Sequence, residues 1–449
     1  MIPVPVRETS GRHGHVDSHY AATAAMPEHS ALAGRLEADV CVVGGGLAGL
    51  TAALELARAG KDVVLVEAER IGWAASGRNG GFVSAGYSQS ILKLESRLGK
   101  EHAQALYRLS ADGVDYVRKL IADYGRGDLI GGHGWLKMIR HGDIAVLERQ
   151  AERMTRDYGA AYRVVGRDEL AGFVSSTRYH GGLLDLRPFH IHPLGYAGAV
   201  AGAAMQVGAR LFERSRVTAL ARRNGRWVAE TAQGTVEAGD VVLATSAYGG
   251  PSGRLNASIL PVSTYVVTAR SSRLDEAIRF EGCLGDTRRA GDYYRLVGSG
   301  EDRRLLWGGR ITTRQSVPPA LGQKLAGDIR SVYPQLDDLV IERAWAGLMG
   351  YAVHKMPILG PVEDGLWAAS AFGGHGLNTT AMAGCLIATA IAEGDDRWKL
   401  FEPFAMRWGG GPLGRAATQL EYWRLQILDR IEESRAPAVS RRSGPTLPN

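Results

Sequence analysis

Residues 38–67 read ADVCVVGGGLAGLTAALELARAGKDVVLVE, which is two short apolar runs separated by a glycine-rich turn and an Ala/Leu-rich stretch. The run 38–43 is almost wholly apolar, as expected of a strand that is buried on both faces of a parallel sheet. A helix is expected over 50–59, because the segment ends at Gly60, and a second strand over 62–67. The stretch therefore predicts a βαβ unit with its glycines at the first turn.

The glycines of this turn have separate physical tasks in a dinucleotide site. Gly44 permits the tight turn out of the strand, Gly46 lets the backbone approach a pyrophosphate, and Gly49 lets the helix pack close to the sheet. The helix N-terminus supplies free N–H groups and partial positive charge for the phosphates. Glu67 ends the second strand, 18 residues after Gly49, where its carboxylate can accept both ribose hydroxyls and would repel the 2′-phosphate of NADP. The alternative is a glycine-rich turn that binds nothing.

Composition limits the class of protein. Glycine accounts for 59 of 449 residues without a Gly-X-Y period, and 45% of the chain is hydrophobic, enough for a large core. The net charge of +6 comes from basic residues scattered among acids, which argues against nucleic-acid binding. Cys41, Cys283 and Cys385 are far apart, which argues against disulfides or a zinc site. We therefore expect no metal. No stretch resembles a membrane span or a secretory signal, so we expect a cytoplasmic protein.

The rest of the chain alternates between helical and strand-like patterns. Helices are expected over 88–124, 144–156, 193–207 and 417–433, the third of which begins with a proline suited to a first helical turn. Strand-like runs dominate 211–308 and return at 340–348. These segments, with the βαβ unit, predict an α/β protein.

Six stretches spread over the chain resemble the D-amino-acid-oxidase-like (DAO) superfamily of FAD-dependent amine oxidoreductases, most closely the γ-glutamylputrescine oxidoreductase type. They are ADVCVVGGGLAGL with VVLVEAERIGWAASGRNGGF (38–82), HIHPLGYAGAVAGAAMQVGARLFERSRV (190–217), VVLATSAY (241–248), DYYRL with LLWGGR (292–310), WAGLMGYAVHKMPILG (345–360) and SAFGGHGLNTTAMAG (370–384). These blocks in this order are far more specific than the glycine turn alone.

The resemblance implies FAD, bound non-covalently because Gly347 stands where some relatives carry a linking cysteine. It implies that loop 74–81 lies against the flavin, that the backbone of Val217 meets adenine, and that the helix after Gly376 points its N-terminus at the flavin pyrimidine edge, where it stabilises negative charge on the reduced ring. A surface loop, a strand valine and an ordinary helix start are the alternatives. The candidate cofactor residues are Gly44, Gly46, Leu47, Ala48, Gly49, Glu67, Ala68, Ser76, Arg78, Asn79, Gly80, Gly81, Val217, Ala244, Thr245, Gly374, His375, Gly376 and Leu377.

The chemistry implied by the resemblance is oxidation of a C–N bond by hydride transfer to flavin N5, then imine hydrolysis and electron transfer to O2 or another acceptor, such as a quinone. Met349 stands where D-amino-acid enzymes commonly hold the α-carboxylate with arginine, and Asn378 where sarcosine-type oxidases have lysine. The loss of both cations favours an amine, such as a γ-glutamylated diamine, because an unpaired buried carboxylate is costly. Arg78, Arg295 or Arg310 could still bind a remote carboxylate.

Candidates for the catalytic cavity are few, because the cofactor performs the difficult step. Tyr265 and Tyr294 lie with Trp345 on strands that resemble cavity walls, although aromatic core packing is an equal alternative. Sarcosine-type oxidases place a lysine near N5, and Leu306 aligns with it here. His354 with Lys355 is a candidate source of the missing positive charge, and a surface turn is the alternative for this pair. His190 and His192, before a helix, are expected to be structural. The four candidates are Tyr265, Tyr294, Arg310 and His354.

The expected domain organisation is discontinuous. An N-terminal extension (1–37) precedes a Rossmann-like FAD-binding domain assembled from 38–87, 190–255 and 345–400. A sheet-containing α+β substrate domain takes 88–189 and 256–344, and 401–449 form a C-terminal helix and a disordered tail. The alternatives to an amine oxidoreductase are a D-amino-acid dehydrogenase or glycine-oxidase-type enzyme and a non-catalytic flavin-binding protein. No nucleic-acid or membrane partner is expected, and nothing indicates the oligomeric state.

Overall fold

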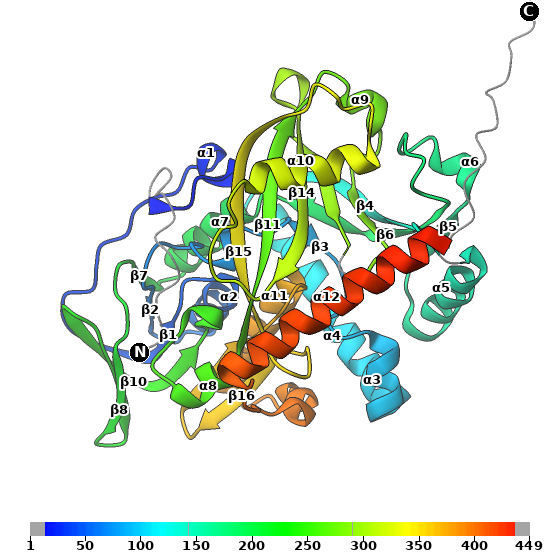
Figure 1. The fold of residues 1–449 in the computed structure, drawn as a ribbon. Helices are drawn as coiled ribbons and strands as arrows, with labels where there is room; N and C mark the ends of the chain where they lie inside the picture. The colour runs from blue at the N-terminus through cyan, green and yellow to red at the C-terminus, as the bar shows by residue number, and fades with distance from the viewer. Residues whose placement is uncertain (1–13, 142, 290, 436–449) are drawn as a thin grey trace, which may run out of the picture.

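The computed structural model of the 449-residue chain describes residues 14–141, 143–289 and 291–435, whose strands form two sheets with helices around them (Figure 1). The expected disordered tail after the last helix lies outside the described residues, as do the first 13 residues of the N-terminal extension. Within the described residues, no helix combines the length and the apolarity needed to cross a bilayer.

The first sheet has the order β16-β17-β10-β1-β2-β7, with β8 and β9 as a hairpin beside β10. The strands from β17 to β7 are parallel, and β16 is an antiparallel edge. Its strands are β1 (Gly34–Val43), β2 (Val63–Val66), β7 (Arg210–Phe212), β8 (Ala219–Arg223), β9 (Arg226–Glu230), β10 (Gly234–Leu243), β16 (Ile358–Glu363) and β17 (Leu366–Ser370). The predicted βαβ unit, β1–α2–β2, is confirmed at the centre of this sheet.

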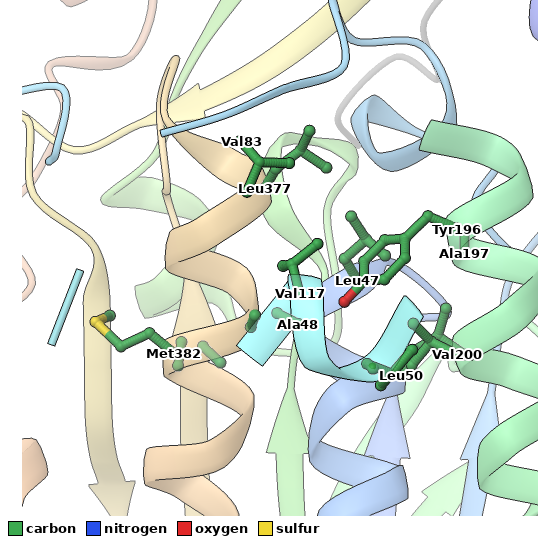
Figure 2. Close-up of a cluster of buried hydrophobic side chains, with 14 of the residues drawn as sticks. Leu47, Ala48, Leu50, Val83, Val117, Tyr196, Ala197, Val200, Leu377 and Met382 are labelled. Atoms are coloured by element: carbon green, nitrogen blue, oxygen red, sulfur yellow. The ribbon is translucent and has the colours of Figure 1, made fainter. Parts of the chain in front are cut away.

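Helices cover one face of the first sheet, and a second apolar cluster covers the other. Val40 and Val42 of β1 pack with the helices, whereas Cys41 and Val43 pack with the β8–β9 side. This explains why the last four residues of β1, 40–43, are all apolar. The covering helices are α2 (Leu47–Arg58), α4 (Lys100–Asp123), α7 (Pro193–Gln206) and α11 (Gly376–Glu393), and Figure 2 shows their side chains in the shared cluster, among them Leu50, Val117, Val200 and Met382.

The second sheet has the order β15-β11-β14-β13-β12-β4-β6-β3, with β5 beside β6. Its strands are β3 (Phe82–Val83), β4 (Ile130–Met138), β5 (Tyr162–Val165), β6 (Gly182–Ile191), β11 (Leu260–Arg270), β12 (Cys283–Asp286), β13 (Tyr293–Val297), β14 (Arg304–Thr312) and β15 (Val340–Tyr351). One face, the outer face, packs against α10 (Leu321–Val332), with Tyr265, Trp307 and Leu325 in one cluster. The other, the inner face, carries Val266, Leu306 and Trp345, which belong to the cluster of the first sheet's helices.

Several elements differ from the sequence-based expectation. The helix expected over 88–124 is two helices, α3 (Ile91–Leu98) and α4, because Gly99 turns the chain at φ +88°. The expected domain boundary at residue 345 falls inside β15, which pairs with β11 from Val340 to Tyr351 without leaving the second sheet. The remaining α-helices are α1 (His19–Thr23), α5 (Ile144–Tyr158), α6 (Arg167–Leu170), α8 (Gly253–Ala257), α9 (Leu274–Ala277) and α12 (Gly411–Arg435).

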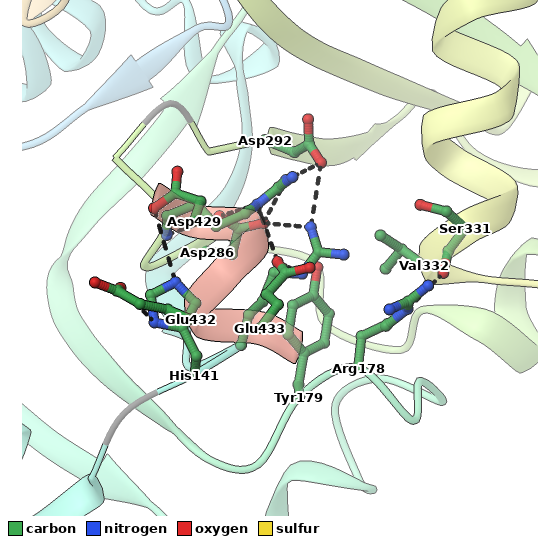
Figure 3. A network of polar contacts seen from close by, with 12 residues as sticks. His141, Arg178, Tyr179, Asp286, Asp292, Ser331, Val332, Asp429, Glu432 and Glu433 are labelled. Atoms are coloured by element: carbon green, nitrogen blue, oxygen red, sulfur yellow. Dashed lines mark hydrogen bonds and ion pairs between the residues drawn. The ribbon is translucent and has the colours of Figure 1, made fainter. Parts of the chain in front are cut away.

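The C-terminal helix α12 lies across the molecule and is attached by charges near its end (Figures 1 and 3). Arg289 donates to Asp429 at 2.8 Å and to Glu432 at 2.8 Å, and Arg140 lies 3.1 Å from Glu433. His141, Asp429 and Glu432 have ligand-type atoms within 4.8 Å of one another. Because both acids are bonded to Arg289, we interpret this trio as part of the helix attachment.

Candidate cofactor and substrate site

The first glycine turn admits no side chain at two of its positions. Gly44 has φ +115°, and a Cβ atom there would lie 2.6 Å from the carbonyl oxygen of Ala244. A Cβ at Gly49, in the first turn of α2, would lie 2.0 Å from the carbonyl oxygen of Gly44. The turn therefore brings the N-terminus of α2 directly onto the ends of β1 and β10.

The N-terminus of α2 has polar groups suited to an anion. Gly46 is its N-cap and makes no side-chain capping bond. The backbone N–H of Leu47 donates to Oγ of Ser76 at 2.9 Å, so loop 74–81 is held at this helix end. Ala48 follows in the first turn, buried. Free N–H groups and the helix dipole make this place favourable for a phosphate.

Glu67 lies beside the same turn, at the end of β2. Its carboxylate accepts from the backbone N–H of Gly45 at 2.5 Å and from that of Glu69 at 2.8 Å. Burial raises its pKa, and the two backbone hydrogen bonds oppose this shift. Each carboxylate oxygen of Glu67 can accept further hydrogen bonds, so this carboxylate fits the two hydroxyls of a ribose. Ala68 follows Glu67 in the chain and lies beside the same place.

The loop 74–81 is fixed by its own amide side chain. Asn79 donates to the carbonyl oxygens of Ala75 and Ser76 at 3.0 and 2.9 Å and accepts from the N–H of Gly81 at 2.8 Å. A Cβ at Gly80 would lie 2.7 Å from the ring of Tyr293, and one at Gly81 would lie 2.4 Å from the carbonyl oxygen of Ile191. The loop is thus pressed between the first helix turn and the inner face of the second sheet.

Two arginines fix the position of this loop: Arg78, within the loop, contacts the preceding Trp73, and Arg295 of β13 binds the loop from the second sheet. The Arg78 guanidinium lies 4.3 Å from the ring centre of Trp73, and its Nε donates to the Trp73 carbonyl oxygen at 2.7 Å. Arg295, 2% exposed, donates to the Gly80 carbonyl oxygen at 2.7 Å and to Nδ1 of His190 at 2.6 Å. Its remaining bonds go to the hydroxyl of Tyr20 and the carbonyl oxygen of Ile191.

Two further places carry unused polar groups. Oγ1 of Thr245, just after Ala244 at the end of β10, is buried and has no hydrogen-bond partner among the described residues. The backbone of Val217 takes part in no hydrogen bond between described residues. Both fit a bound ligand that reaches from the glycine turn along the strand ends.

The second glycine turn leads into α11. The N–H of Gly374 donates to Oγ of Ser88 at 2.8 Å, and His375 is the N-cap of α11 without a side-chain capping bond. A Cβ at Gly376 would meet nothing within 4 Å, whereas Leu377 is buried in the cluster of Figure 2. Burial, and to a lesser extent the charge of Lys137, lowers the pKa of His375 to about 4, so this imidazole is neutral at pH 7.

The inner face of the second sheet presents an aromatic group toward these turns. Phe82 contacts Trp135 and Tyr293 edge to face, with ring centroids 5.7 and 5.8 Å apart. Trp135 lies 6.4 Å from the ring of His375. This inner aromatic group was not anticipated, although the alternation in the run 135–138 (WLKM) indicates that Trp135 shares a face with Lys137.

The structure places Tyr265 and Tyr294 on the opposite, outer face. The Tyr265 hydroxyl bonds to Oγ1 of Thr312 at 2.8 Å, and Tyr294 stacks on Trp307 at 4.2 Å with its hydroxyl 2.7 Å from that of Tyr333. Successive strand residues point to opposite faces, so of the adjacent pair the inner tyrosine is Tyr293. We expected Tyr265 and Tyr294 on a cavity wall, and this expectation was wrong because both pack in the core against α10.

The other two cavity candidates also lie among structural contacts. Arg310 forms a two-point ion pair with Asp328 at 2.6 and 2.9 Å. His354 is buried against Phe404, and its Nδ1 accepts from the N–H of Met356 at 3.2 Å. Burial lowers its pKa to about 4, so within the candidate pair His354–Lys355 the imidazole supplies no positive charge at neutral pH.

The histidines before α7 are structural, as expected. His192 is the N-cap of α7 and accepts from the N–H of Gly195 at 3.0 Å. His190 lies between Arg295 and the carbonyl oxygen of Glu281, which it contacts through Nε2 at 2.8 Å. Asn378 donates to the carbonyl oxygens of Ser110 and Gly86, so it joins α11 to neighbouring segments.

Known proteins are similar to this chain in sequence. The model of the family DAO, FAD dependent oxidoreductase, matches residues 39–390. The chain is 33% identical to a γ-glutamylputrescine oxidoreductase of Escherichia coli, covering 86% of this chain and 91% of that protein. It is 30% identical to a probable oxidoreductase OrdL of Haemophilus influenzae, covering 88% and 92%.

Solved structures agree on the fold. A glycine oxidase from Geobacillus kaustophilus superimposes with a TM-score of 0.68 at 22% identity, covering 83% of this chain and 99% of that one. An L-proline dehydrogenase from P. horikoshii gives the same TM-score at 20% identity. The chain belongs to the DAO family of FAD-dependent oxidoreductases.

Proposed function

We propose that the protein binds FAD non-covalently and oxidises the C–N bond of an amine, with a γ-glutamylated diamine as the leading substrate. The observation that carries the proposal is that two glycine turns, at Gly44 and Gly374, both connect to the inner aromatic group of the second sheet. The first connects through loop 74–81, which contacts Leu47 and Tyr293, and the second through His375, which lies 6.4 Å from Trp135. Both turns lead into helices whose own N-cap residue supplies no capping bond, α2 and α11. Such helix ends favour anionic groups, as a dinucleotide and a reduced flavin have.

The residues along this path fit FAD in the order of its parts. The free backbone of Val217 and the carboxylate of Glu67 suit adenine and ribose, and the end of α2 with Ser76 suits the pyrophosphate. The loop held by Asn79 suits the ring system, with α11 at its pyrimidine edge. Cys41 and Cys283 are buried strand residues, and Cys385 lies within α11, so no cysteine of the segment 345–360 is available for a covalent link.

Bound FAD supplies a two-electron acceptor for the carbon that bears the amine. The chain itself contributes position and a water-poor wall: Phe82, Trp135 and Tyr293 form an apolar surface beside His375. Because His375 is neutral at pH 7, it places no positive charge against an incoming ammonium. The amine must lose its proton before oxidation, and this apolar surface favours the neutral amine over the ammonium because burial disfavours the charged form.

The choice of amine over α-amino acid rests on four positions considered as partners for an α-carboxylate, of which two hold uncharged side chains and two hold arginines bonded to protein groups. Met349 and Asn378 stand where the related enzymes have cationic groups, Arg295 is fully bonded to protein groups, and Arg310 is paired with Asp328. A short α-carboxylate next to the reacting carbon would therefore lack a partner. The 33% identity to the γ-glutamylputrescine oxidoreductase supports a longer amine.

The proposal is tested by anaerobic reduction of the purified flavoprotein. We expect γ-glutamylputrescine to bleach the flavin absorbance faster than putrescine, glycine, sarcosine or D-alanine, with peroxide formed on admission of air if O2 is the acceptor. Faster bleaching by D-alanine, glycine or sarcosine would establish the amino-acid alternative. No bleaching with any amine or amino acid would favour a non-catalytic flavin protein.

A further inference from the structure

Three positions of the second sheet form one row on its inner face. In the strand register, Lys137 of β4 is paired with Gly285 of β12, and Gly285 is paired with Tyr293 of β13. Paired residues point to the same face of a sheet, so Lys137 and Tyr293 stand on either side of a glycine. Gly285 leaves the space between them without a side chain.

A second donor reaches the same space. Trp135 lies two residues before Lys137 on β4, and its Nε1 would be 3.4 Å from a Cβ atom built on Gly285. That indole N–H is buried and has no hydrogen-bond partner among the described residues. A buried N–H without an acceptor is unfavourable, so a ligand that supplied an acceptor over Gly285 would satisfy it.

The charge of Lys137 is also unused. Among residues 14–141, 143–289 and 291–435 it forms no ion pair and no hydrogen bond, in contrast to Arg295 and Arg310. Asp286 is the acid that acts on Lys137 electrostatically, but its carboxylate is bonded to Arg288 at 2.8 Å and lies 3.4 Å from Arg140.

The surroundings of Lys137 differ from those of an ordinary surface lysine. The side chain is solvent-accessible, yet enough protein surrounds the ammonium for desolvation to lower its pKa, which Asp286 only partly opposes. Its charge also lowers the pKa of His375, the N-cap of α11. A partly dehydrated cation without a partner is unfavourable, and a bound carboxylate would relieve this cost.

We propose that Lys137 and the indole N–H of Trp135 form a subsite over Gly285 for the carboxylate of the substrate, remote from its reacting amine. This inference rests on the proposed amine oxidation and narrows the substrate to amines that carry a distant carboxylate. Hydrogen bonds between an ammonium and a carboxylate are charge-assisted and strong, so this subsite discriminates against simple diamines.

The spacing of the row suits such a substrate. Two strand intervals separate β13 from β4, which is about 10 Å, and Tyr293 at one end packs on Gly80 of the loop 74–81. An extended γ-glutamyl diamine measures roughly 11 Å from its reacting carbon to its α-carboxylate at ordinary bond lengths. A molecule of this length reaches from the loop to Lys137.

The test compares the holoenzyme with Lys137→Met, Lys137→Arg and Trp135→Phe on two substrates, γ-glutamylputrescine and its decarboxylated counterpart, 4-aminobutanoylputrescine. The wild type should prefer the carboxylated substrate, and Lys137→Met should lower this preference in kcat/KM about tenfold to a hundredfold. Lys137→Arg should keep most of the preference, and Trp135→Phe should lower it severalfold. Lys324→Met, at an exposed lysine of α10, is the matched control and should keep the wild-type preference.

A binding measurement separates recognition from chemistry. γ-Glutamylbutylamine keeps the carboxylate but lacks the reactive amine, and its Kd, read from the flavin absorbance change, should rise in Lys137→Met by the same factor. If γ-glutamylputrescine reduces the wild-type flavin but Lys137→Met retains the full preference and Kd, the subsite is wrong and the proposed oxidation stands. If γ-glutamylputrescine and simpler amines all fail to reduce the wild-type flavin, the proposed function itself is wrong.

Discussion

Tyr293 and Tyr294 are neighbours in sequence with opposite surroundings. Tyr293 packs on Gly80 and has its hydroxyl 3.3 Å from Oγ1 of Thr264 on the inner face. Tyr294 is enclosed in the α10 core with Trp307 and Tyr333. Both are aromatic residues in a strand, so the sequence motif DYYRL does not distinguish them, and only the pairing of β13 with β12 and β14 assigns each to its face.

This difference predicts opposite effects of the same substitution. Tyr293→Phe should lower kcat/KM by up to about tenfold, the value of one neutral hydrogen bond, with little change in Tm. Tyr294→Phe should destabilise the fold by about 1–3 kcal/mol, because the buried hydroxyls of Tyr179 and Tyr333 lose a partner, while the folded enzyme keeps its kcat. Steady-state kinetics and thermal unfolding of both variants check this; an active Tyr293→Phe beside an inactive Tyr294→Phe would contradict it.

Glu67 offers a test of the cofactor site that needs no substrate. Glu67→Ala removes the carboxylate beside the first glycine turn and should weaken FAD binding about tenfold to a hundredfold, as expected for a charged hydrogen-bond acceptor. Glu69→Ala is the matched control, since Glu69 pairs with Arg216 at the surface. The Kd for FAD of the apoprotein, from quenching of flavin fluorescence, measures both, and equal values for the two variants would exclude the proposed role of Glu67.

Helical glycines differ in the space around them, which gives a prediction at the level of elements. Gly49→Ala in α2 would force a Cβ against the carbonyl oxygen of Gly44, so we expect loss of FAD and a strongly destabilised protein. Gly202→Ala in α7 meets nothing within 4 Å and should be neutral or stabilise by about 0.5–1 kcal/mol. Urea unfolding and the bound-flavin content decide between them, and similar results for the two would contradict the close turn.

The sequence was informative at this level where a segment has one strong period. The βαβ unit over 38–67, the helix after Pro193 and the C-terminal helix could be predicted because their apolar spacing, glycine stops and caps are local. Strand β12, helix α10 and the inner aromatic group could not be predicted in this way. Strand β12 has only the residues Cys283–Asp286, and the face on which Trp135 or Tyr293 lies depends on which strands pair. Local sequence patterns predict helices and strands, whereas the pairing of strands in the sheet decides which side chains face the candidate site.

At the scale of the whole molecule, α12 is held by charge more than by apolar contact. Its residues Leu413, Leu420, Trp423 and Ile427 are exposed, whereas Asp429 is buried and bonded to Arg289. Arg289→Ala should lower stability by about 1–3 kcal/mol and expose the end of α12 to protease, without loss of FAD. Arg424→Ala, which breaks only the pair with Glu421 inside the helix, is the control. Equal protease resistance of Arg289→Ala and the wild type would disprove this attachment.

Acid should destabilise the protein through its buried histidines. Burial lowers the pKa to about 4 in His19, His354 and His375. It lowers the pKa of His192 to about 3 and that of His190 well below its usual value. Between pH 6.5 and 4 the unfolded chain binds protons that the folded chain does not, so stability falls as the pH falls. The urea midpoint should therefore be lower at pH 5 than at pH 7.5.

His192→Asn provides the comparison for this pH dependence. Asparagine keeps an N-cap acceptor for α7 but takes no proton, so the variant should lose stability less steeply between pH 7.5 and 5 than the wild type. An unchanged slope in the variant would mean that His192 is not held neutral in the fold.

The central claim, a bound FAD that takes electrons from a carboxylate-bearing amine, is tested most directly by one anaerobic titration. Purified holoenzyme is titrated with γ-glutamylputrescine while the visible absorbance of the flavin is followed. We expect bound, non-covalent FAD that bleaches fully at about one equivalent of substrate per flavin, as a two-electron acceptor requires. A protein that binds no FAD, or a bound flavin that keeps its absorbance at saturating substrate, would contradict the claim.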